Sequence, residues 1–148
     1  VGRTKLSECE RKRLLAGWGV ATEELATSGT EVGSSVKRDD QLGPVLMYGM
    51  GGTVAEMGAE VTPRVCPNSE QDAQDMVNEV AGSRILIGSN GRPKADVDSL
   101  INTLVRVSEL AVNLEGIIDE ININPLIVLP RGQGVKVLEA DITLSHQQ

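Results

Sequence analysis

A short apolar run that ends in a glycine-rich segment constrains this chain more than any other feature. Pro44-Val45-Leu46-Met47-Tyr48 is typical of a buried strand, and Gly49-Met50-Gly51-Gly52 follows it directly. Glycine lets the backbone adopt positive φ and approach a ligand closely while it presents N–H donors. The pattern predicts a buried strand that leads into a phosphate- or carboxylate-binding loop. A tight strand-to-helix turn is the alternative, because the segment has neither the P-loop ending nor the Rossmann spacing.

Helix and strand signals interleave along the rest of the chain. Capping patterns and one amphipathic run predict the helices, and short apolar or alternating runs predict the strands. We expect helices at 7–16, 69–80 and 96–114, strands at 31–37, 44–48, 64–66, 117–129 and 135–144, and turns at 38–43 and 130–134. This order predicts a mixed α/β (α+β) fold that closes with an antiparallel hairpin.

Composition excludes several classes of function. A net charge of −7 argues against a general nucleic-acid or anionic-membrane binder, and Trp18 and Tyr48 are the only aromatic residues. The single histidine, His146, is the third residue from the end of the sequence. We therefore do not expect a zinc site, a Ser-His-Asp triad or a Cys-His dyad, since each needs a histidine in the core of the fold. Cys9 and Cys66 match no metal spacing and are interpreted as small buried apolar residues. No apolar run reaches about 18 residues, so we expect no membrane span. From the negative charge we expect no nucleic-acid polymer as a partner, and reduced thiols suit a cytoplasmic protein.

A second polar pattern lies near the C-terminus. Strand alternation places Glu120, Asn122 and Asn124 on one side of the predicted strand, with isoleucines on the other. Glu139 is expected on the partner strand of the hairpin. Carboxylate and carboxamide oxygens are suitable ligands for Mg²⁺, which needs few protein ligands. The alternative is the solvated face of a hairpin. Arg92 similarly predicts either a phosphate contact or an exposed turn charge.

Taken in order, these segments resemble a known family. The chain is similar to the ATP-grasp domain or beta subunit of NDP-forming acyl-CoA synthetases, which include ADP-forming acetyl-CoA synthetase and are related to the beta subunit of succinyl-CoA synthetase. The resemblance extends over both ends and nearly all of the chain from Val36 onward. The residues that match the family's motifs are 6–8, 14–15 and 19–20 near the start, followed by 36–39, 43–52, 56, 91–96, 104–108, 120–126 and 137–142.

The resemblance implies an ATP/ADP and Mg²⁺ site. It assigns Mg²⁺ binding to Asn124 and Glu139 on the last two strands. Asn122 stands where the family has an acidic residue, so one formal charge is lost and Mg²⁺ binding should weaken. The cofactor-binding residues that we carry over are Gly49, Gly51, Gly52, Glu56 and Arg92.

The resemblance also shows that this sequence lacks one segment of the family's pattern. The family carries a further subdomain, with a lysine for the nucleotide phosphates, where this chain has a short polar bridge at 27–35. We therefore expect a truncated ATP-grasp-like fold, divided into an N-terminal helix with its bridge (1–35) and an α/β domain (36–148).

Two functions remain open from the sequence. The first is part of an NDP-forming acyl-CoA synthetase that binds Mg-nucleotide or phosphate, is inactive alone, and relies on a CoA-binding partner that supplies the phosphohistidine. The second is a non-catalytic relative that acts as an oligomerisation or protein-binding module. A shortened chain exposes apolar surface, so we also expect self-association.

Overall fold

The computed structural model describes residues 6–18, 29–50, 61–80, 86 and 94–145, and its centre is an antiparallel sheet of six strands. The strand order is β3-β2-β1-β4-β5, and β6 also pairs with β4. In chain order the elements are α1 (Glu8–Gly17), β1 (Thr30–Asp39), β2 (Gly43–Met50), β3 (Thr62–Val65), α3 (Glu70–Glu79), α4 (Val97–Asn113), β4 (Ile118–Val128), β5 (Val135–Val137) and β6 (Ala140–Leu144). The mixed α/β class with an antiparallel sheet confirms the sequence prediction.

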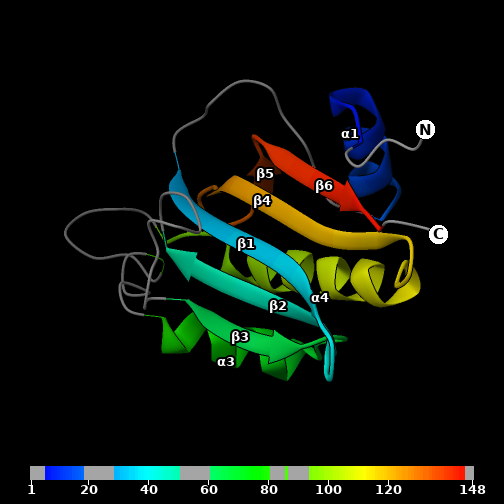
Figure 1. Ribbon diagram of the computed structural model, residues 1–148. Helices are drawn as coiled ribbons and strands as arrows, with labels where there is room; N and C mark the ends of the chain where they lie inside the picture. Colours follow the sequence, from blue (N-terminus) through cyan, green and yellow to red (C-terminus); the bar gives the residue numbers. More distant parts are fainter. Residues whose placement is uncertain (1–5, 19–28, 51–60, 81–85, 87–93, 146–148) are drawn as a thin grey trace.

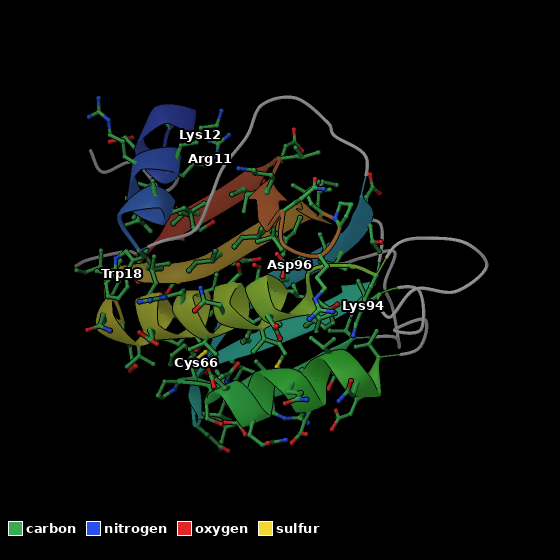
Figure 2. All side chains as sticks on the ribbon, turned by 180° about the vertical axis from the view of Figure 1, so that it is seen from behind. Arg11, Lys12, Trp18, Cys66, Lys94 and Asp96 are labelled. Atoms are coloured by element: carbon green, nitrogen blue, oxygen red, sulfur yellow. The ribbon has the colours of Figure 1, made fainter. Side chains whose placement is uncertain are left out.

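Two helices cover one face of the sheet. Helix α4 packs on β1, β2, β4 and β5, and α3 packs on β2, β3 and α4. Figure 1 shows the sheet in front of these helices, and Figure 2, from the opposite side, shows the helices in front of the sheet. Leu100, Leu104 and Leu110 of α4 are fully buried, at roughly 1.5–3 kcal/mol each. In the part of the chain that the structure describes, the opposite face carries neither α3 nor α4. We call it the helix-free face in this sense alone.

The predicted caps are confirmed. Ser7 and Ser69 each begin a helix with a capping box, the first completed by Glu10 and the second by Asp72. Both arrangements are local in sequence, because the cap side chain and the backbone N–H it binds lie three residues apart. Trp18 is the C-cap of α1, close to the end predicted for this helix.

The strands differ from the prediction chiefly at both ends of β1 and in the last predicted strand. β1 extends through Asp39, and the turn is confined to the next residues, where Asp39 Oδ1 accepts hydrogen bonds from the N–H groups of Gln41 and Leu42. β1 also begins at Thr30, inside the segment expected as a polar bridge. The last predicted strand is divided into β5 and β6, so Glu139 lies in the gap between two strands.

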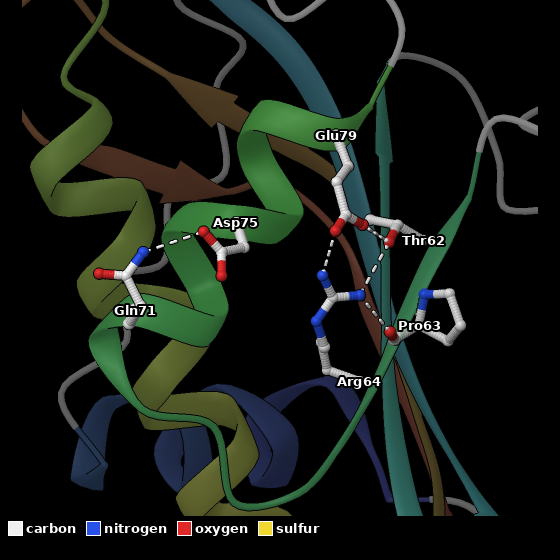
Figure 3. A network of polar contacts seen from close by, with 6 residues as sticks. All are labelled: Thr62, Pro63, Arg64, Gln71, Asp75 and Glu79. Carbon is white, nitrogen blue, oxygen red and sulfur yellow. Dashed lines mark hydrogen bonds and ion pairs between the residues drawn. The ribbon is translucent and has the colours of Figure 1, made fainter.

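The edge strand β3 is tied to α3 by a polar network, drawn in Figure 3. Thr62 Oγ1 donates to Glu79 Oε2 at 2.7 Å, and Arg64 forms an ion pair with the same carboxylate. The hydrogen bond from Arg64, followed by that from Thr62, lowers the pKa of Glu79. Cys66, just after β3, is buried as expected, and burial raises the pKa of its thiol to about 11.

Asp96 joins the start of α4 to the turn that precedes β5. Its carboxylate accepts from Ser99 N, from Ser99 Oγ and, at 2.8 Å, from Gly134 N. Figure 2 labels it at the N-terminal end of α4. Burial raises the pKa of Asp96, but the hydrogen bonds from Ser99 and Gly134 outweigh burial and the pKa lies below its ordinary value. The predicted cap is therefore confirmed, and it also fixes the β4–β5 turn.

We predict that Asp96→Ala lowers the free energy of unfolding at pH 7 by about 1–3 kcal/mol, because it removes a helix cap and the acceptor for Gly134 N–H. The folded-state pKa is depressed, so this contribution is present above the unfolded pKa of about 3.9 and disappears as the pH falls through the folded value. Urea unfolding at pH 7 and near pH 3 measures both effects.

The matched control is Asp98→Ala, an exposed carboxylate in the same first turn of α4. It should cost less than about 0.5 kcal/mol. Equal losses for the two variants would contradict the role given to Asp96.

Candidate functional site

The predicted metal-binding segment lies on the strand with the most partners. β4 pairs with β1 along one edge and with β5 and β6 along the other. The odd-numbered Ile121 and Ile123 of β4 are buried in the core, and Ile121 faces Val36 and Ile142 across the neighbouring strands. Side chains alternate along a strand, so Asn122 and Glu120 belong to the helix-free face.

One row of residues crosses this face at Asn122. In register, Met47 of β2 lies beside Ser35 of β1, Ser35 lies beside Asn122, and Asn122 lies beside Asp141 of β6. Directly opposed residues of antiparallel strands project to the same side. The adjacent row on one side is Val45, Lys37, Glu120 and Thr143.

The adjacent row on the other side contains three of the predicted site residues. Gly49 pairs with Gly33. The β1–β4 register shifts at Gly33, so that this single residue opposes both Asn124 and Pro125. On the far edge of β4, Ile123 pairs with Ala140 and Leu126 with Val137, which places Glu139 level with Asn124.

This register also explains the break between β5 and β6. Pro125 has no backbone N–H and cannot donate to a ladder, and it lies level with the residue before Glu139. A bulge with two residues opposite one re-aims side chains, and such bulges are common beside binding sites. The sheet thus brings Gly49, Asn122, Asn124 and Glu139 into two neighbouring rows. Gly51, Gly52, Glu56 and Arg92 lie outside the described residues.

Two buried oxygens in these rows have no hydrogen-bond partner. They are Asn122 Oδ1 and Ser35 Oγ. An unpaired buried acceptor is costly, and a cation or a cation-bound water would satisfy it. Among the described residues, no group of three or more His, Cys, Asp or Glu side chains is arranged to hold a metal. Carboxylate and amide oxygens are the donors that Mg²⁺ prefers, and Mg²⁺ needs few protein ligands because it keeps several of its waters.

Arg38 and Tyr48, which lie in the segments that carry the resemblance, have structural roles. Arg38 forms an ion pair with Asp119 at 2.9 Å, and Asp119 also accepts from Ser145 Oγ. Tyr48 is fully buried in the core, and burial raises the pKa of its phenol. In the part of the chain that the structure describes, no helix is long and apolar enough to cross a bilayer.

Sequence reasoning missed Gly33, Ser35 and Asp141. The first two lie in a segment with only weak strand character, where the run Gly-Ser-Ser of small residues was the one available signal. Asp141 carried no signal of its own, because its place beside Asn122 depends on the register of β6.

Comparisons with known proteins agree with this fold and with the motifs. The family model described as an ATP-grasp domain matches residues 8–144. The beta subunit of the ADP-forming acetate–CoA ligase II of Pyrococcus furiosus is 35% identical over 127 residues, which cover 86% of this chain and 54% of that protein. This chain therefore spans about half the length of that relative.

Two solved structures are also similar to this chain. One is an acetyl-coenzyme A synthetase 1 of Candidatus Korarchaeum cryptofilum, described as dinucleotide forming and solved in complex with coenzyme A and Mg-AMPPCP. It has a TM-score of 0.76 and 38% identity, over 82% of this chain and 56% of that one. A Pyrococcus horikoshii protein, PH1788, shares the fold with a TM-score of 0.91 at 22% identity, over 99% of this chain and 94% of that one.

The ordered motifs, the antiparallel sheet with its bulge at Asn124 and Pro125, and these comparisons lead to one conclusion: the chain belongs to the ATP-grasp family, and its relatives are ATP-grasp subunits of ADP-forming acetyl-CoA synthetases.

Proposed function

We propose that this chain is the part of an acyl-CoA synthetase subunit, ADP-forming type, that holds the phosphates and the Mg²⁺ of a bound nucleotide. The observation that carries the proposal is the pair of neighbouring rows on the helix-free face, which collect Gly49, Asn122, Asn124 and Glu139 from three separate segments. Asn122 Oδ1, which lies in these rows without a hydrogen-bond partner, supports the proposal because a cation or a hydrogen-bond donor would satisfy it.

Each residue has a role in this proposal. Asn124 and Glu139 bind the cation, and Asn122 contributes a neutral amide oxygen. Gly49 and Gly33 lie side by side with no side chain to keep a phosphate at a distance. Bound Mg²⁺ would neutralise phosphate charge and orient the phosphoryl group for transfer.

The chain alone is expected to be inactive. It spans about half of its relative's length, and its one histidine, His146, lies outside the described residues. The acetyl-coenzyme A synthetase of Korarchaeum is described with coenzyme A and with a phosphohistidine segment that points towards the nucleotide site. We propose that a partner chain or domain of this chemistry supplies the CoA-binding site and the phosphohistidine.

Calorimetric titration with ATP, with and without Mg²⁺, tests the proposal. We expect Mg²⁺-dependent binding to the wild-type chain, and about tenfold weaker binding to Asn124→Ala, which removes a ligand oxygen. Asn113→Ala is the matched control, since Asn113 is an exposed residue at the end of α4. No binding at millimolar nucleotide, or equal weakening by both variants, would contradict the proposal.

A second candidate function, a self-associating module, is favoured by one observation. A hollow of about 490 Å³ lies between α1, the end of α4 and β6. Its apolar residues include Leu14, Leu114 and Ile117, and Ile117 is 53% exposed. An exposed apolar hollow of this kind is suited to a second copy of the chain.

Sedimentation velocity over a range of concentrations tests this candidate. We expect the wild-type chain to self-associate and Ile117→Ser to remain monomeric, because the substitution removes exposed apolar area from the hollow. Leu42→Ser, at 59% exposure in the β1–β2 turn, is the control and should associate like the wild type. A wild-type chain that stays monomeric at high concentration would exclude the module.

A further inference from the structure

Two residues that each carry a buried, unpartnered oxygen lie beside each other on adjacent strands. Ser35 of β1 is 1% exposed, and its Oγ has no hydrogen-bond partner. It is paired in register with Asn122 of β4, whose Oδ1 is also buried without a partner. Such directly opposed residues have Cβ atoms about 4.5–5.5 Å apart. The two residues are therefore direct neighbours on the helix-free face.

The chemistry of the two groups specifies what is missing. An amide oxygen only accepts hydrogen bonds, whereas a serine hydroxyl both donates and accepts. The group that satisfies Asn122 Oδ1 must therefore be a donor or a cation. Buried polar atoms in folded proteins almost always have such a partner, so this pair is built around something further.

The surrounding charges favour a cation with its waters over an anion. Among the described residues of these rows, the carboxylates are those of Glu120, Glu139 and Asp141, and the one cation is that of Lys37. Mg²⁺ keeps several of its waters when protein ligands are few, and those waters are strong hydrogen-bond donors. Neutral oxygens are well suited to accept from such waters.

We propose that Ser35 is an additional residue of the cation site, where its hydroxyl and the Asn122 amide oxygen accept hydrogen bonds from water bound to Mg²⁺. The inference rests on the proposed function, since it needs a cation on the helix-free face. It assigns to Ser35 a part in binding that neither the sequence motifs nor the comparisons give it. It also accounts for Asn122, because a neutral amide holds the cation through water where a carboxylate would bind it directly.

Ser34 provides a matched control on the same strand. It is equally buried at 1% exposure, but its Oγ donates to the Met47 carbonyl oxygen at 3.0 Å. Strand alternation places it on the helix-covered face. Ser34 thus has a partner within the fold and no access to the proposed site, while Ser35 has neither partner nor helix contact to lose.

Mn²⁺ binding followed by electron paramagnetic resonance, together with thermal unfolding, separates the two serines. In Ser35→Ala we expect the Kd for Mn²⁺ to rise about threefold to tenfold with no fall in Tm, because the deleted hydroxyl has no partner in the fold. In Ser34→Ala we expect Tm to fall by a few degrees while the Kd stays unchanged. Asn122→Asp should lower the Kd, since it adds a negative charge at the site.

The outcomes are distinguishable. If the wild-type chain binds Mn²⁺ and Ser35→Ala binds it equally well, the inference about Ser35 is overturned while the proposed function stands. If the wild-type chain binds no Mn²⁺, with or without ATP, both are overturned. A fall in Tm for Ser35→Ala without a change in Kd would make Ser35 a structural residue and would also overturn the inference.

Discussion

The pairing of β4 on both edges is the constraint on which the rest of the structure depends. This strand carries β1 along one side and β5 and β6 in turn along the other. Because side-chain period in a strand is two, a slip of one residue would carry the buried isoleucines to the helix-free face and the polar residues into the core. The apolar face of β4 therefore fixes the register, and the register fixes which polar residues meet.

The interruption of that register has its own consequence. The bulge at Asn124 and Pro125 opposes two residues to Gly33 and coincides with the gap between β5 and β6. Below it, Asn122 faces Ser35 and Asp141; level with it are Gly49 and Glu139. The same short segment thus ends the regular pairing and lies in a row next to that of Asn122. Asp96 supports this arrangement from the core side, because it links α4 to the turn that returns the chain as β5.

Local sequence signals predicted the helices well. The strands and the candidate site were predicted less completely, because they depend on pairing between segments that are distant in sequence. The caps at Ser7, Ser69 and Asp96 were predictable because each acts within three residues of itself. β1 was harder, since its small polar residues are buried by neighbours that are distant in sequence. Ser35 could not be identified from sequence at all, because a buried hydroxyl without a partner exists only once the facing strand is in register. The divided last strand depended in the same way on Pro125 across the sheet.

The most direct measurement is a two-dimensional amide NMR spectrum of the isotope-labelled chain with substoichiometric Mn²⁺ and ATP. Paramagnetic broadening falls steeply with distance, so it locates the cation. A site on the helix-free face should broaden the amides of Ser35, Asn122 and Asp141 first and leave those of α3 sharp. Broadening centred instead on the exposed carboxylates of α3, such as Glu70 and Asp75, or spread evenly over the chain, would contradict a cation site on this face.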